Sequence, residues 1–317
     1  MALQLVHITD KGDVRSSNQD SFCARISSFG QETVALLAVC DGVGGLQAGE
    51  LASTGAVRCF EDWFEQQLPQ IMQSGLTDTM VFLSWHQILE NLHNALCEYA
   101  ERSAMQFGTT VSALLISSDR LYWVQVGDSR IYLDDGAGTE QLTKDQTLAM
   151  REVEAGRLSP EAMQTDQRKN ILLQCLGYGK MEPVFQSGPR PQRGAVVLCS
   201  DGFCHYLAEK QIHRLLTETE TREQLWQQMQ KTVEYCRAHG ETDNITALVL
   251  KWDGQEQKRS DSAEWIEVWA RLSGEAAPEE YDRVLRFAER IGIEQGFRQE
   301  GSAACESFIP EFDERGL

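Results

Sequence analysis

The sequence predicts an α+β fold in which helices pack on sheets. Segments with the pattern of strands come in runs and segments with the pattern of helices come in pairs, whereas regular βαβ alternation would predict a parallel sheet. With 317 residues and 42% hydrophobic residues, the chain is long enough to bury a full core without disulfides or metals. This length fits one large domain or two small ones.

Before Trp252, apolar residues recur at helical spacing in four segments, at residues 49–68, 78–106, 208–216 and 222–239. The second segment is the longest of them. One of its faces carries Leu83, Ile88, Leu92, Leu96 and Tyr99. We therefore expect four helices in this part of the chain, each with an apolar face that packs on another element.

Short runs rich in apolar, β-branched and aromatic residues predict the strands. They lie at residues 33–40, 109–117, 121–126, 130–133, 195–199 and 245–252. The first run ends at Asp41 and Gly42, which favours a buried strand that leads into a turn. Turn signals at Ser118-Asp119 and Gly127-Asp128 separate the strands in the middle of the chain.

The charge balance excludes several classes of function. The chain has 29 Lys and Arg against 48 Asp and Glu, so its net charge is -19. No basic patch interrupts this acidity, and we expect neither nucleic acid nor an anionic membrane as a partner. No apolar run approaches the ~20 residues of a membrane span, and the N-terminus lacks the pattern of a signal peptide. The nine cysteines form no CxxC pair and lie mostly in apolar runs, which indicates buried, reduced thiols in a cytoplasmic protein.

The composition changes after Trp252. Residues 253–261 are polar and suit a linker. Residues 253–317 carry 16 acidic and 8 basic side chains, and two amphipathic helices are predicted at 263–272 and 278–291. This tail is either a small appended module or a partly disordered extension.

Five aspartates stand out along the chain. Asp41, Asp201 and Asp243 lie next to predicted strands and are each followed by Gly or Asn, Asp128 lies in a turn between two predicted strands, and Asp20 ends the segment that begins at Arg15. Taken singly, each fits an ordinary turn or cap residue. Taken together, they would repel one another strongly, because strand ends in a packed sheet collect at a shared edge. A divalent cation relieves that repulsion, and carboxylate oxygens suit Mg²⁺ or Mn²⁺. The histidines show no zinc-site spacing.

Seven short motifs follow one another along the chain. They are residues 9–12 with 15–20, 39–45 with 49–53, 108–110, 126–130, 142–145, 199–202 and 242–246. In this order they resemble the metal-dependent Ser/Thr protein phosphatase family, type 2C, in its bacterial form. The resemblance covers about residues 5–252. It implies a catalytic domain at 1–252, an acidic C-terminal extension at 253–317, and a four-layer αββα sandwich with metals at one end.

The resemblance also implies a set of metal-binding residues. Asp41 bridges two Mn²⁺ or Mg²⁺ ions, and the carbonyl of Gly42 binds one of them. Asp201 and Asp243 bind the other ion. Asp20 holds a metal-bound water.

Two further roles follow from the resemblance. Asp128, together with Asp201, matches the site of a third, weaker metal ion. Arg15 grips the substrate phosphate, a role that suits a planar guanidinium. Catalysis is then assigned to Arg15 and Asp41, and a metal-bridging hydroxide attacks phosphorus directly. No cysteine is needed as a nucleophile, and the pattern of Cys, five residues and Arg is absent.

The chain departs from the family pattern at three positions. Gln19 stands where many members have Glu, which predicts weaker metal binding there. Val43 replaces a His that is thought to protonate the leaving group, so this acid is unassigned and a metal-bound water is the expected substitute. Gln146 stands where a His is common. Residues 146–181 resemble the family's flap at the edge of the active site, although a plain helical insertion fits the pattern equally well.

The implied function is hydrolysis of phospho-Ser and phospho-Thr in proteins, opposing bacterial Ser/Thr kinases in the cytoplasm. The alternative is a pseudophosphatase that binds phosphoproteins without turnover, which the residues at Gln19 and Val43 motivate. For the tail, docking of a partner is the working hypothesis.

Overall fold

The computed structural model describes residues 3–30, 32–43, 49–106, 108–163 and 165–253. The two helices predicted at 263–272 and 278–291 lie outside these residues. Within the described part of the chain, no helix combines the length and the apolar character needed to cross a bilayer.

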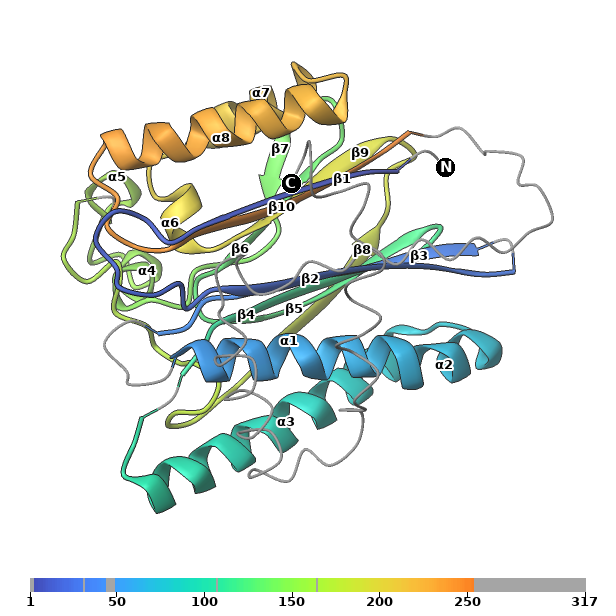
Figure 1. The fold of residues 1–317 in the computed structure, drawn as a ribbon, viewed down its shortest axis with the longest axis horizontal. Coiled ribbons are helices and arrows are strands. Elements are labelled where there is room, and N and C mark those ends of the chain that lie inside the picture. Colours follow the sequence, from blue (N-terminus) through green and yellow to red (C-terminus); the bar gives the residue numbers. More distant parts are fainter. Residues whose placement is uncertain (1–2, 31, 44–48, 107, 164, 254–317) are drawn as a thin grey trace.

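Two five-stranded sheets, antiparallel throughout, form the centre of the molecule (Figure 1). The first sheet contains, in spatial order, β1 (Leu3–Asp10), β10 (Ile245–Trp252), β9 (Gly194–Cys199), β6 (Arg130–Asp134) and β7 (Thr139–Gln141). The second contains β2 (Ser21–Phe29), β3 (Glu32–Cys40), β4 (Val111–Ile116), β5 (Arg120–Val126) and β8 (Val184–Pro189).

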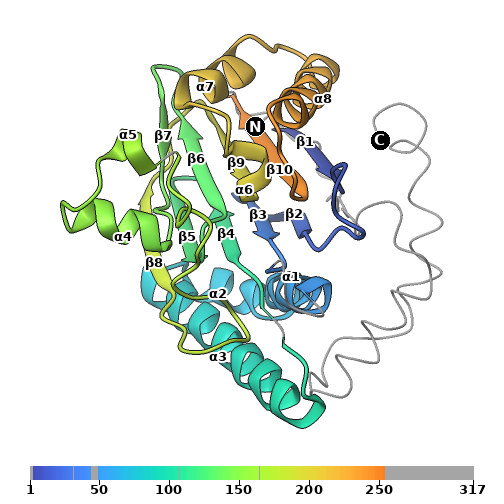
Figure 2. The same cartoon turned by 90° about the vertical axis from the view of Figure 1, so that its left-hand side faces the viewer.

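Helices cover the outer face of each sheet, which gives the four layers of the expected αββα sandwich (Figures 1 and 2). The second sheet is covered by α1 (Gly49–Gln66), α2 (Leu68–Ser74) and α3 (Asp78–Ser103). The first sheet is covered by α6 (Asp201–Cys204), α7 (Glu209–Thr217) and α8 (Arg222–Ala238). Two short helices, α4 (Leu148–Glu154) and α5 (Pro160–Met163), lie in the segment that connects β7 to β8.

Three apolar clusters fill the spaces between the four layers. Between α1, α3 and the second sheet, Trp85 meets Phe60 and Trp63 edge to face, with ring centroids 5.5 and 5.4 Å apart. Between the sheets, side chains such as Leu37 and Leu248 are fully buried. A central strand is thus buried on both faces, and this is why residues 34–40 are continuously apolar.

The predicted helix at 49–68 is shorter than expected. The structure ends α1 at Gln66 and begins α2 at Leu68. Pro69 explains the break, since proline lacks a backbone N–H and disfavours helical geometry in the residue before it. Ser159 is the N-cap of α5, because its Oγ accepts a hydrogen bond from the Ala162 N–H at 3.2 Å.

Candidate active site

The five aspartates come from both sheets, which corrects the expectation that they share one sheet edge. Asp41 follows β3 and Asp201 follows β9, whereas Asp20 precedes β2 and Asp243 precedes β10. Asp128 lies in the turn between β5 and β6. The sheets are stacked with these strand ends at the same end of the sandwich, where α1 and α6 begin (Figures 1 and 2).

Asn244 fixes the loop that carries Arg15 and Asp20. Its Nδ2 donates to the carbonyls of Lys11 and Ser17 at 2.9 and 3.0 Å. Its Oδ1 accepts from the Gln19 N–H at 2.8 Å. One side chain beside Asp243 therefore positions a segment more than 200 residues away in the sequence.

Two glycines allow the backbones to approach closely at this end. A Cβ at Gly202 would lie 2.2 Å from the carbonyl oxygen of Asn244. A Cβ at Gly42 would lie 2.6 Å from the carbonyl oxygen of Gln19. Any side chain at either position would push the aspartate-bearing segments apart.

The carboxylates disturb one another's ionisation. Burial, followed by the charges of Asp20, Asp201 and Asp243, raises the pKa of Asp41 well above its ordinary value. Burial is also the main cause that raises the pKa of Asp20 to about 7. The pKa of Asp128 is raised well above its ordinary value, by burial and then by the charge of Asp201. A group of acids with these shifts indicates a site built to hold positive charge.

Protein donors already occupy one oxygen on each of three aspartates. Arg15 Nη2 donates to Asp243 Oδ2 at 2.7 Å, and Ser200 Oγ donates to Asp20 Oδ2 at 2.9 Å. The third donor is His205, whose Nε2 lies 3.2 Å from Asp201 Oδ2. With the side chains held in this way, no three His, Cys, Asp or Glu residues of the described segments converge as a ready metal-binding group.

Two carboxylate oxygens nevertheless remain without a hydrogen-bond partner in the described part of the chain. Asp20 Oδ1 and Asp201 Oδ1 are buried and have no hydrogen-bond partner among the described residues. A buried, unpaired carboxylate oxygen is costly. These hard oxygen donors fit Mg²⁺ or Mn²⁺ and do not fit a softer metal.

His205 and Glu241 belong to this end of the molecule, although the sequence motifs do not include them. Burial lowers the pKa of His205, but Asp201 and Glu241 outweigh it and the pKa rises to about 11. Burial would likewise raise the pKa of Asp201, and the neighbouring His205 reverses this, so that it is lowered. The sequence does contain one sign of the contact between His205 and Asp201, because the two residues are four positions apart, which places them side by side on a helical turn.

The remaining predicted residues have ordinary contacts. Gly42 donates its N–H to the Gln19 carbonyl at 3.1 Å and forms a bridge with Thr109. The Gln19 amide donates to Glu50 Oε2 at 3.0 Å. In the segment expected as a flap, Gln146 Oε1 accepts from the Gly127 N–H at 2.6 Å. This bond ties the base of that segment to the turn that carries Asp128.

The cysteines agree with the expectation of free thiols. The eight cysteines in the described residues are unpaired, and all of them except Cys59 and Cys97 are buried.

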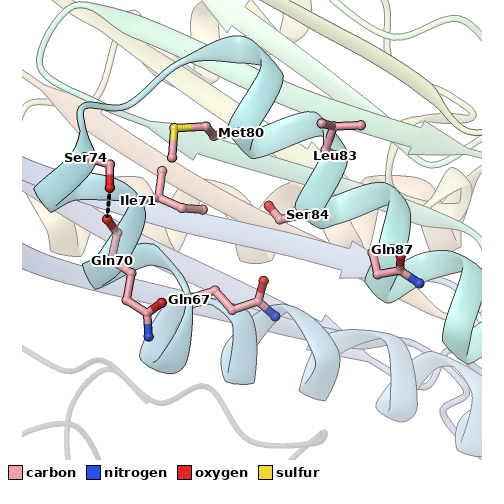
Figure 3. A pocket seen from close by; sticks show the side chains of 8 residues that line it. All are labelled: Gln67, Gln70, Ile71, Ser74, Met80, Leu83, Ser84 and Gln87. Atoms are coloured by element: carbon pink, nitrogen blue, oxygen red, sulfur yellow. Dashed lines mark hydrogen bonds between the residues drawn. The ribbon is translucent and has the colours of Figure 1, made fainter.

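A separate groove lies between α2 and α3, at the other end of α1 from the aspartates (Figures 1 and 3). It has a volume of about 510 Å³. Its walls are uncharged and include Gln67, Ile71, Met80 and Leu83 (Figure 3). Because it carries no ionisable group, it offers no acid or base for catalysis.

Comparison with known proteins agrees with this arrangement. The family model described as Protein phosphatase 2C matches residues 12–249. The serine/threonine phosphatase stp of Listeria monocytogenes is 30% identical over 259 residues, which covers 80% of this chain and 98% of that protein. The protein phosphatase PhpP of Streptococcus pneumoniae is 27% identical over 258 residues, which covers 80% of this chain and 99% of that protein.

Solved structures show the same fold. The serine/threonine phosphatase Stp1 from Staphylococcus aureus superposes with a TM-score of 0.69 at 25% identity, over 80% of this chain and 96% of that one. The catalytic domain of the phosphatase PstP, solved with two manganese ions, gives a TM-score of 0.62 at 25% identity, over 78% of this chain and 97% of that one. The order of motifs, the two-sheet sandwich and these matches together lead to one conclusion: the chain belongs to the protein phosphatase 2C family.

Proposed function

We propose that this protein is a metal-dependent phosphatase that hydrolyses phospho-Ser and phospho-Thr in proteins. The observation that carries the proposal is the pair of unpaired, buried oxygens on Asp20 and Asp201, beside Asp41, whose pKa is raised by burial and then by the charges of Asp20, Asp201 and Asp243. Relatives named Ser/Thr phosphatases, one of them solved with two manganese ions, support the same chemistry. The alternative of a pseudophosphatase is not favoured, because these relatives are named as phosphatases and the expected acidic residues are all present.

The metal-binding roles are assigned as follows. Asp41 would bridge two Mn²⁺ or Mg²⁺ ions, with the Gly42 carbonyl on one ion and Asp201 and Asp243 on the other. Asp20 would act through a bound water. Asp128 with Asp201 would hold a third ion. When bound, such ions supply ionised water near neutral pH and offset the charge that develops on the phosphoryl group.

The side chains of the protein then orient the substrate. Arg15 is 36% exposed and faces Asp243, so it can turn from that carboxylate to two oxygens of a phosphate. Asn244 holds the loop that carries Arg15 through the carbonyls of Lys11 and Ser17, and the guanidinium lies beside Asp243. A water oxygen bonds to phosphorus while the bond to the Ser or Thr oxygen breaks, and that oxygen takes up a proton.

The context of this activity is also proposed. The substrates would be phosphorylated proteins in the cytoplasm, and the opposing enzyme would be a Ser/Thr kinase. The residues from 1 to 252 would form the catalytic domain, with residues 146–181 as its flap. The acidic residues 253–317 would dock a partner. Removal of residues 253–317 is then expected to leave hydrolysis of a small phosphoester intact, and loss of that hydrolysis would place the tail in the catalytic fold.

The test is Mn²⁺-dependent release of phosphate from a phospho-Thr peptide by the full chain. We expect Asp41→Asn to lower kcat by about 10²- to 10³-fold, in the range seen when a principal charge-stabilising group is removed. The matched control is Asp62→Asn. It makes the same chemical change at a residue of α1 outside the group of aspartates, and it should keep the wild-type rate. Equal rates for wild type and Asp41→Asn would rule out the assignment.

A further inference from the structure

His205 and Glu241 form a buried pair behind two of the aspartates. His205 directly follows α6, and Glu241 lies in the turn between α8 and β10. Their side chains are 13% and 5% exposed. Burial of an ionic pair costs free energy of desolvation, and the contacts of the pair with its neighbours must offset that cost.

The pair connects two segments that each carry an aspartate. His205 Nε2 lies 3.2 Å from Asp201 Oδ2, and His205 Nδ1 lies 2.8 Å from Glu241 Oε2. Because an ionised carboxylate only accepts hydrogen bonds, both ring nitrogens act as donors here. The other oxygen of the glutamate, Oε1, accepts from the backbone N–H groups of Thr242 and Asp243 at 2.7 and 2.9 Å. The contacts therefore run without a gap from the Asp201 side chain to the Asp243 backbone.

This connection determines which oxygen of Asp201 is available to a cation. The ring of His205 holds Oδ2, which restricts rotation of the carboxylate. The oxygen left without a partner among the described residues is Oδ1, and it is buried. Ligand carboxylates in metal sites are commonly fixed by such hydrogen bonds from a residue that does not touch the metal.

We propose that His205 and Glu241 are positioning residues that hold Asp201 and Asp243 as one unit for binding a divalent cation. The inference rests on the proposed function only in that Asp201 and Asp243 are taken as cation ligands. Neither His205 nor Glu241 touches substrate in this account. Their effect is exerted through the orientation of Asp201 and the placement of the Asp243 backbone.

The test measures Mn²⁺ binding directly, by calorimetry and by the electron paramagnetic resonance signal of free Mn²⁺. We expect His205→Gln to raise the Kd of Mn²⁺ by about 10-fold or more. Glu241→Gln breaks the same connection at its other end, since one amide oxygen cannot serve both His205 and the backbone donors, and it should also raise the Kd. The double variant should bind about as weakly as the weaker single variant, because residues that act as a unit are not additive.

The chain offers a matched control. His213 Nδ1 lies 2.6 Å from Asp134 Oδ2, which is the same kind of pair on β6 and α7. His213→Gln should leave the Mn²⁺ Kd unchanged. Melting in chelator separates positioning from stability, because a merely structural role would lower the melting temperature of His205→Gln and leave the Kd of Mn²⁺ at its wild-type value.

The outcomes are distinct. An unchanged Mn²⁺ Kd in folded His205→Gln or Glu241→Gln overturns the inference, as does an equal change in His213→Gln. If His205→Gln does not fold, Glu241→Gln decides in the same way. If instead the wild type binds Mn²⁺ but releases no phosphate from the peptide, the proposed function fails while the inference about binding stands.

Discussion

Arg15 Nη2 donates to Asp243 Oδ2 at 2.7 Å, so the expected phosphate-binding cation is paired with an expected metal ligand. The hydrogen bond to Asp243 is the largest cause that raises the pKa of Arg15. In this arrangement the two residues satisfy each other. A cation that takes Asp243 Oδ2 would free Arg15 Nη2 for a phosphate, which links the two binding events.

The first prediction concerns this pair. Arg15→Gln frees Asp243 from its cationic partner, so we expect Mn²⁺ to bind several-fold more tightly. The same change removes the guanidinium from the phosphate, so the KM for a phosphopeptide should rise about 10-fold or more. Calorimetry with Mn²⁺ and steady-state kinetics measure the two effects. The control is Arg237→Gln, since Arg237 pairs with Asp10 beside the same loop. If Arg15→Gln weakened the binding of Mn²⁺ as well as the binding of the phosphopeptide, the linkage would be contradicted.

The second prediction concerns metal removal. A cation that binds only the folded protein stabilises it by mass action, by about 2.7 kcal/mol at a concentration 100 times its Kd. Addition of Mn²⁺ to the chelated protein should therefore raise the melting temperature. Asp41→Asn should lose most of this rise, because Asp41 would contact both core ions. A rise of the same size in Asp41→Asn would show that the stabilising ion binds elsewhere.

The third prediction tests the close approach at Gly202. A Cβ at this position would lie 2.2 Å from the Asn244 carbonyl oxygen, so Gly202→Ala should cost about 2 kcal/mol of unfolding free energy or more. The control is Gly138→Ala, where a Cβ would meet no atom within 4 Å. Urea denaturation in chelator compares the two variants. A Gly202→Ala protein as stable as Gly138→Ala would show that the segments carrying Asp201 and Asp243 are not packed as described.

The fourth prediction is a pH dependence far from the aspartates. Burial, and then the charge of Arg222, lowers the pKa of His7 to about 4. The unfolded chain, with its ordinary pKa near 6.5, therefore binds a proton that the folded chain does not, and the fold loses stability as the pH falls from about 6.5 to 4.

His7→Phe removes this contribution and keeps a ring beside Phe22, whose centroid lies 5.0 Å from that of His7. Relative to wild type, the variant should gain on the order of 2 kcal/mol between pH 7 and pH 4.5. Denaturant unfolding at the two pH values measures the gain. His86→Phe is the control, because the His86 side chain is 50% exposed. A gain of equal size in His86→Phe would show that His7 is not the cause of the stability lost at low pH.

The helices and central strands were predictable because burial leaves a periodic or continuous apolar pattern. The helix at 78–106 and the strand at 33–40 are of this kind, and the structure has α3 and β3 there. The strand β2 was not predicted, since Ser21, Arg25 and Ser27 interrupt its apolar pattern although all three are buried. Their burial depends on partners elsewhere, such as the salt bridge from Arg25 to Glu65 on α1, and a local pattern cannot show such a partner.

The motifs singled out the five aspartates, but they did not show how the fold arranges them. That Asp41 and Asp201 come from different sheets depends on how the sheets stack, which no single strand encodes. The role of His205 was missed for a similar reason. Its contact with Asp201 lies within one helical turn, whereas its contact with Glu241 spans 36 residues and exists only in the folded chain.

The most direct test of the central claim is a crystal of the full chain soaked in Mn²⁺, with anomalous density collected at the manganese edge. The account predicts two strong peaks that share Asp41 as a ligand, one of them also contacted by Asp201 and Asp243, with Arg15 turned away from Asp243. A soaked crystal that diffracts well, has manganese peaks elsewhere and shows none at Asp41 would contradict the account.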